Sequence, residues 1–86
     1  MNMFLKLTHL DRSQIIINVD DIVYIEERII TETRRESCIC VKKYDNCFTV
    51  IVKDNIEDIY ELLKAGNRMI IIEENGKMTL VPVTHV

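Results

Sequence analysis

Three cysteines are the side chains in this sequence with the widest range of chemistry, because a thiolate can bind a metal ion or form a disulfide. They stand at Cys38, Cys40 and Cys47. On the hairpin expected here, Cys38 and Cys40 share one strand face about 7 Å apart, and Cys47 lies roughly 13 Å from Cys40. A zinc ion needs its ligands within about 2.3 Å of one point. The spacing therefore favours structural thiols over a metal site or a redox centre.

General acid–base catalysis would need a positioned histidine or two converging carboxylates. Neither His9 nor His85 has a cysteine, serine or acid beside it in the arrangement of an activated nucleophile. The carboxylates occur as adjacent pairs at residues 20–21, 26–27 and 73–74, and neighbours along a strand point to opposite faces. We therefore predict no catalytic residue, no cofactor and no metal, and we expect that the protein is not an enzyme.

One cluster of arginines could bind a phosphate or an acidic partner surface. Arg34 and Arg35 lie in a polar loop, with Arg28 at the end of the preceding strand, and Glu32 and Glu36 dilute their charge. A simply solvated loop is the alternative interpretation. Because the loop is longer than packing requires, we take Arg28, Arg34 and Arg35 as the candidate binding loop.

The length and composition limit the kind of protein this can be. A chain of 86 residues predicts one domain, residues 1–86, and a domain of this size buries only about 60% of its unfolded surface, so oligomerisation would help it. The net charge of −3 disfavours a nucleic-acid binder. The sequence has no apolar run of about 18 residues, so we predict no membrane span. An odd number of cysteines and no signal-peptide pattern predict a cytoplasmic protein with reduced thiols.

The pivot of the predicted fold is the stretch IIINVDDIVYIEE at residues 15–27, where two β-rich segments meet at a short acidic elbow. The pattern predicts strands at residues 3–10, 15–19, 22–30, 38–43 and 47–53, a helix at 55–65, and strands at 68–73 and 77–83. The predicted class is α+β and mainly β: an antiparallel five-stranded meander, one short helix and a C-terminal β-hairpin. Residues 31–37 are expected to form a solvated loop into which the strands could extend.

Local signals refine these elements. A turn at residues 45–46 would pair Tyr44 with Cys47 and gather the apolar side chains of that hairpin on one face. Asp54 is the expected N-cap, with Glu57 completing a capping box, and Gly66 is the expected C′ residue.

The outer and inner strands are predicted from two further signals. Pro82 indicates that the last strand is an edge strand, and the isoleucine runs at residues 15–17 and 70–72 indicate central strands. The predicted core consists of Ile15, Ile17, Ile22, Tyr24, Ile39, Val41, Phe48, Val50, Ile59, Leu63 and Ile71.

Several short motifs lie along residues 3–64. They are Leu7-Thr8, Leu10-Asp11, Ile17-Asn18, Asp21-Ile22, Ile25-Glu26-Glu27 and the helix start VKDNIEDI at residues 52–59. Together they resemble the FlbD family of small flagellar and swarming-motility proteins. Arg12 stands where that family usually has glycine in the first turn, and the hairpin at residues 68–83 follows the point where typical members end. The resemblance implies action through other proteins, without catalytic residues.

A second resemblance, carried by the IVYIE strand at residues 22–26, is to LytTR-type DNA-binding domains. The leading hypothesis is a non-enzymatic protein-interaction module of FlbD-like type, a motility-linked homo-oligomer with an unidentified protein partner. Two alternatives stay open. One is a phage or mobile-element protein that sequesters a small nucleotide ligand, and the other is LytTR-like nucleic-acid binding through Arg28, Arg34 and Arg35.

Overall fold

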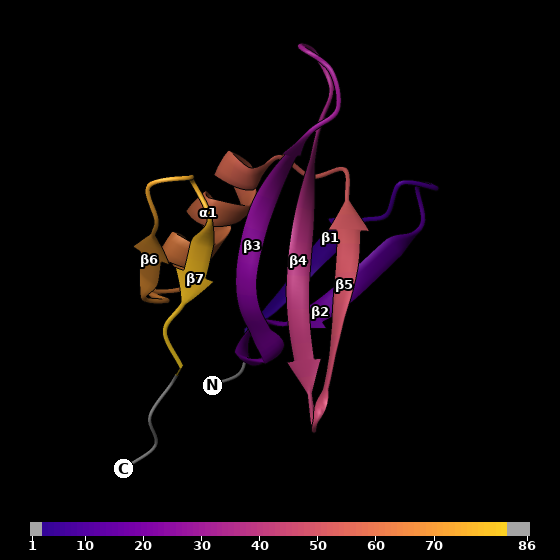
Figure 1. The fold of residues 1–86 in the computed structure, drawn as a ribbon. Helices are drawn as coiled ribbons and strands as arrows, with labels where there is room; N and C mark the ends of the chain where they lie inside the picture. Colours follow the sequence, from indigo (N-terminus) through magenta and orange to yellow (C-terminus); the bar gives the residue numbers. More distant parts are fainter. Residues whose placement is uncertain (1–2, 83–86) are drawn as a thin grey trace.

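The computed structural model describes residues 3–82 (Figure 1). Strands dominate this part of the chain and one α-helix follows the fifth of them, so the predicted mainly-β α+β class is confirmed. In chain order the elements are β1 (Phe4–Thr8), β2 (Gln14–Asn18), the 3-10 turn η1 (Val19–Asp21), β3 (Ile22–Ile29), β4 (Arg35–Lys43), β5 (Asn46–Val52), α1 (Ile56–Ala65), β6 (Ile70–Ile72) and β7 (Met78–Leu80).

The strands form two antiparallel sheets, one with the order β5-β4-β3-β7-β6 and one that pairs β1 with β2. The predicted meander is interrupted, because η1 carries the chain from one sheet to the other and β2 does not pair with β3. Figure 1 shows the β1–β2 hairpin behind β3, β4 and β5, with α1 on the same side. A β-bridge between His9 and Val52 connects the two sheets.

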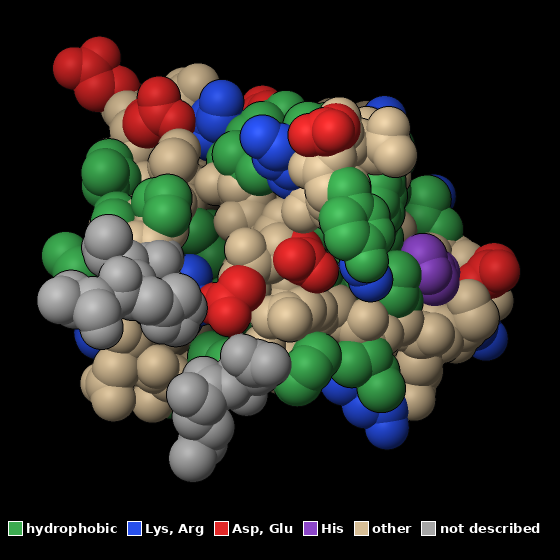
Figure 2. All heavy atoms as spheres, turned by 90° about the horizontal axis from the view of Figure 1, so that it is seen from below, with side chains coloured by type: hydrophobic (Ala, Val, Ile, Leu, Met, Phe, Trp, Pro, Cys, Tyr) green, Lys and Arg blue, Asp and Glu red, His purple; other side chains and the backbone are tan. Residues whose placement is uncertain are grey.

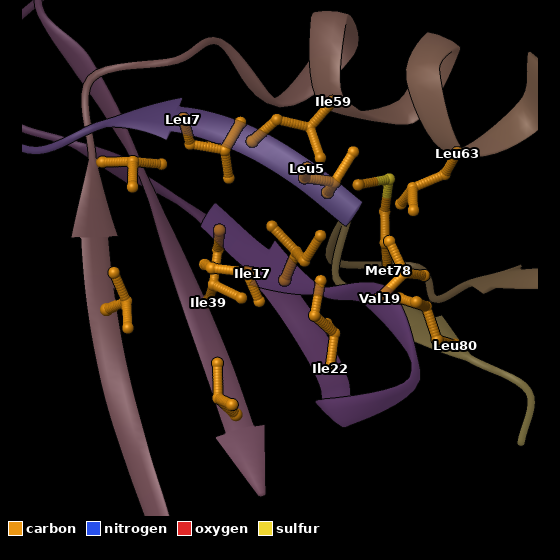
Figure 3. Packing of buried hydrophobic residues seen from close by; sticks show 14 residues of the cluster. Leu5, Leu7, Ile17, Val19, Ile22, Ile39, Ile59, Leu63, Met78 and Leu80 are labelled. Atoms are coloured by element: carbon orange, nitrogen blue, oxygen red, sulfur yellow. The ribbon is translucent and has the colours of Figure 1, made fainter. Parts of the chain in front are cut away.

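The core lies between the large sheet on one side and the β1–β2 hairpin and α1 on the other. Figure 3 shows Ile59 of α1 above Leu5 of β1, and Leu63 beside Met78 of β7. The buried set is Leu5, Leu7, Ile17, Val19, Ile22, Ile25, Ile39, Val41, Val50, Val52, Ile59, Leu63, Met78 and Leu80. Seven of the eleven predicted core residues belong to it, and Ile15 packs half-buried against it.

A hydrogen-bonded joint centred on Asp54 fastens the end of β1 to the rest of the fold. Its Oδ1 accepts the Thr8 N–H at 2.6 Å, and its backbone C=O accepts the fully buried Ser37 hydroxyl at 2.7 Å. The neighbouring Lys53 N–H donates to the Thr8 C=O at 2.8 Å. One residue therefore ties β1, β4 and the approach to α1 together.

This joint explains why the predicted helix N-cap was wrong. The Asp54 side chain is engaged with Thr8, and Asn55 caps α1 instead by accepting the Glu57 N–H at 2.8 Å. At the other end Asn67, with φ 59°, takes the left-handed C′ position predicted for Gly66.

The β4–β5 hairpin turns one residue earlier than predicted. Lys43 pairs with Asn46, so Tyr44 and Asp45 form the loop and Tyr44 takes a positive φ of 57°. The two strands are shifted by two residues relative to the expected register, and an even shift keeps the same side chains on each face. The predicted apolar face is therefore retained, with Ile39 opposite Val50.

Three predicted core residues are wrong, each for a local reason. A β-bulge between Ile22 and Tyr24 reverses the alternation of β3, so Ile25 is buried and Tyr24 faces outward. Phe48 lies on the correct face near the tip of its hairpin and stays half-exposed. Ile71 points away from the core because β6 is buried on one face only.

The edge and centre assignments of the C-terminal hairpin are also corrected. β7 pairs with both β3 and β6, so it is an interior strand, and Pro82 lies beyond its end. The isoleucine runs predicted as central strands form β2 and β6, each the last strand of its sheet. Val83 of the predicted final strand and His85 lie outside the described residues.

Candidate interaction surfaces

The three arginines of the candidate loop lie on the β3–β4 hairpin. The tip of this hairpin projects beyond the other strands of both sheets (Figure 1). Arg34 pairs with Glu36 at 3.1 Å, and Arg35 pairs with Glu27 at 2.9 Å. Arg28 is the cross-strand neighbour of Glu36. Strand alternation therefore places Arg28 and Arg34 on the same face as Glu36 and Arg35 on the opposite face. A phosphate at this loop would compete with carboxylates already in place.

All three cysteines lie on the outer face of the large sheet, which is the face turned away from the core, and all are free thiols. Cys40 is opposite Thr49, and Cys47 is opposite Lys42. Cys47 is therefore one diagonal step from Cys40, about 7–8 Å between Cα atoms, which corrects the larger separation expected from the sequence. Cys38 follows on the same face, two residues farther along β4.

The surroundings of Cys38 suppress the ionisation of its thiol. Burial raises the pKa of the Cys38 thiol, and the nearby Glu26 carboxylate raises it further. Tyr24 lies opposite Cys40, whose charge and hydrogen bond raise the pKa of the phenol. Because a thiol is nucleophilic only as thiolate, Cys38 is a poor nucleophile at neutral pH. Within residues 3–82, no three His, Cys, Asp or Glu side chains are grouped so as to hold a metal ion.

The two aspartates of the predicted pivot, Asp20 and Asp21, lie in η1, and Asp20 links this turn to a distant part of the chain. Asn18 caps η1 by accepting the Asp20 N–H at 3.0 Å, as the turn interpretation of the two aspartates expects. The Asp20 carboxylate also pairs with Arg68, whose side chain is only 11% exposed. This ion pair fastens η1 to the segment that leads into β6.

β6 is the outermost strand of the large sheet and presents exposed hydrophobic side chains. Met69, Ile71 and Ile72 are 70%, 56% and 58% exposed. In the view from below, hydrophobic side chains gather at the left, on the β6 side of the molecule (Figure 2). Among residues 3–82, β6 pairs with β7 alone, so its other edge is free in this part of the chain.

The hydrogen bonds to β7 determine which backbone groups of β6 lie on that free edge. The Val81 N–H donates to the Met69 C=O at 3.0 Å, and the Glu73 N–H donates to the Lys77 C=O at 2.9 Å. Bonded and non-bonded pairs alternate along an antiparallel ladder, so Ile71 shares its bonds with β7. The N–H and C=O groups of Ile70 and Ile72 consequently point away from the sheet.

A second candidate surface is an open groove of about 270 Å³ between β2 and the β4–β5 hairpin. The exposed side chains of Phe4, Ile16 and Phe48 flank it. Asn18, Asp21 and Lys43 also reach its lining. The groove therefore combines apolar walls with a few polar groups.

Sequence reasoning missed both surfaces, because an isoleucine run reads the same in a central strand and in an edge strand. A signal that was present is the shortness of the β6 run, which turns enclose at residues 66–67 and 74–76.

No family model, no curated protein and no solved structure matches the chain. No helix within residues 3–82 is long and apolar enough to cross a membrane.

Proposed function

We propose that this chain is a non-enzymatic protein-interaction module of FlbD-like type that works as a homo-oligomer in the cytoplasm. The observation that supports this most is the exposure of large hydrophobic side chains beside strand edges that have no partner strand within residues 3–82. Covering apolar surface contributes about 25 cal/mol per Å². A second protein surface laid on these edges would therefore gain both backbone hydrogen bonds and hydrophobic burial.

The two edges serve different partners in this proposal. β6 and the groove beside β2 lie at separate places on the fold. Self-association through one of them leaves the other for a different protein. A scaffold of this kind acts by bringing proteins together, which is the mode of action that the resemblance at residues 3–64 implies.

The link to motility is part of the same proposal and depends on that resemblance. Flagellar genes next to the gene for this chain, and a swarming defect after its deletion, would support the link. A prophage neighbourhood with normal motility after deletion would contradict it, while leaving self-association to be judged by its own test.

Sedimentation velocity from micromolar to millimolar concentration tests self-association. We expect the sedimentation coefficient to rise with concentration toward that of a defined oligomer. A single monomeric species over the whole range would contradict the proposal.

A second candidate function, sequestering a small nucleotide, is favoured by one feature of the groove. Its two aromatic rings, Phe4 and Phe48, flank an opening in which Lys43, Asn18 and Asp21 offer charge and hydrogen bonds. Such a combination suits a planar base with a phosphate. A panel of mono-, di- and cyclic nucleotides should then raise the melting temperature, and no shift with any of them would remove this candidate.

A further inference from the structure

We propose that β6 pairs with the β6 of a second copy around a twofold axis at Ile71, joining two five-stranded sheets into one continuous sheet. This inference rests on the proposed function, because it names the surface through which the chain self-associates. The occupant of the edge is a second copy of this chain in antiparallel orientation.

The backbone of β6 is self-complementary for this pairing. With the axis at Ile71, Ile70 of one copy lies opposite Ile72 of the other, and the twofold axis repeats the pair. These are the two residues whose N–H and C=O groups point away from β7. Each pair can therefore exchange two hydrogen bonds without disturbing the ladder to β7. Ile71 meets its own symmetry mate as a non-bonded pair with Cα atoms about 4.5 Å apart.

The side chains of β6 match this arrangement on both faces of the sheet. Ile71 lies on the outer face and is exposed, so the pairing buries one isoleucine against another across the axis. Ile72 lies on the helix side, where it lines an apolar hollow of about 190 Å³ with Ile56, Tyr60 and Met78. In the proposed pairing, Ile72 lies beside Ile70 of the other copy on this face of the sheet. Exposed cross-strand aliphatic pairs contribute roughly 0.2–1 kcal/mol each.

The charged residues that flank β6 favour an antiparallel pairing of the two copies over a parallel one. The strand is preceded by Arg68 and followed by Glu73 and Glu74. In the antiparallel register, Glu73 of one copy lies opposite the uncharged Met69 of the other. The two acidic ends are then about 13 Å apart along the strand. A parallel pairing would place the acidic ends directly beside each other, which is unfavourable.

A charge introduced at the axis tests the proposal. Ile71→Lys places two lysines opposite each other, and Ile16→Lys is the matched control, because Ile16 is equally aliphatic and 67% exposed on the edge strand β2. We expect Ile71→Lys to raise the dissociation constant at least about tenfold, with Ile16→Lys near wild type. Circular dichroism confirms that each variant is folded.

Each outcome has a distinct meaning. If the wild-type chain is monomeric throughout, both the proposed function and this inference fail. If the wild type self-associates and Ile71→Lys leaves its dissociation constant unchanged, self-association stands and the β6 interface is refuted. Loss of association in the Ile16→Lys variant alone would move the interface to β2.

A disulfide experiment keeps the inference testable if Ile71→Lys does not fold. The three native cysteines are replaced by serine, and Ile71→Cys is then introduced. The expected Cα separation of about 4.5 Å lies within the range for a disulfide. We expect a covalent dimer on mild oxidation, with Ile16→Cys in the same background staying monomeric. Equal cross-linking of the two variants, or none in Ile71→Cys, would overturn the proposed pairing.

Discussion

Replacing Asp54 by alanine should destabilise the protein by removing the side-chain hydrogen bond of the joint that fastens β1 to the rest of the fold. The Asp54 carboxylate accepts the Thr8 N–H at 2.6 Å in a partly buried position. Losing a hydrogen bond to a charged group, and leaving the amide without a partner, costs about 1.5–3 kcal/mol. We therefore expect Asp54→Ala to lower the free energy of unfolding by that amount. Asp54→Asn, which keeps an acceptor oxygen, should lose about half as much.

Ser37 supplies an independent estimate for the same joint. Its fully buried hydroxyl donates to the Asp54 C=O at 2.7 Å, so Ser37→Ala leaves that carbonyl unpaired. We expect a loss of about 1–3 kcal/mol. Since both variants act on Asp54, the double variant should show coupling rather than simple addition.

Urea unfolding at one fixed protein concentration measures these effects, because self-association makes the apparent stability depend on concentration. Asp58→Ala is the control, as Asp58 is an exposed carboxylate in the first turn of α1 that contributes about 0.3–1 kcal/mol through the helix dipole. If Asp54→Ala is no more destabilising than Asp58→Ala, the joint does not hold the two sheets together as described.

Three further predictions concern other parts of the fold. Arg12 has a φ of 75°, so Arg12→Gly should raise the stability by about 1 kcal/mol; Arg12→Ala keeps the strained conformation, and an equal gain from it would contradict the explanation. Asp20→Ala leaves the largely buried Arg68 guanidinium without its carboxylate partner, so thermal unfolding should show a free energy of unfolding lowered by about 1–3 kcal/mol. A loss as small as that of an exposed ion pair would show that this ion pair does not stabilise the fold. In timed thiol labelling, the exposed Cys47 should react before Cys38. Because burial raises the pKa of Cys38, the rate of its labelling should still increase above pH 9.0, the ordinary value of a thiol pKa. Faster labelling of Cys38 than of Cys47 at neutral pH would contradict this prediction.

The elements of the fold could be predicted from the sequence because their signals are local. The alternation of Ile39 and Val41 determines which face of β4 is buried, whatever the exact turn. The apolar stripe of α1 contains Ile59 and Leu63, which the structure buries. The first hairpin also forms where its polar turn predicts it.

The neighbours of the strands could not be predicted in the same way. β7 inserts beside β3, a pairing between residues far apart in sequence that no local pattern records. The bulge after Ile22 exchanges Tyr24 for Ile25 in the core, and nothing in the β-branched run marks it. Asp54 was wrongly predicted as the N-cap of α1. Its side chain is occupied by the Thr8 N–H, and only the folded chain brings these two residues together.

The candidate surfaces show the same limit. The arginine hairpin was visible in the sequence, but the register that places Glu27 and Glu36 beside its arginines was not. Whether Ile71 is buried or exposed depends on which face of β6 packs against the core, and the pairing with β7 decides this. The Arg28, Arg34 and Arg35 loop stays a prediction for ligand or nucleic-acid binding.

Amide hydrogen exchange at β6, measured residue by residue at low and high protein concentration, tests the β6 pairing most directly. The N–H groups of Ile70 and Ile72 should exchange rapidly in the dilute monomer and become protected as the protein associates. The Ile71 N–H, which is bonded to β7, should be protected at both concentrations. Exchange at Ile70 and Ile72 that stays rapid in a fully associated sample would contradict the proposed twofold pairing.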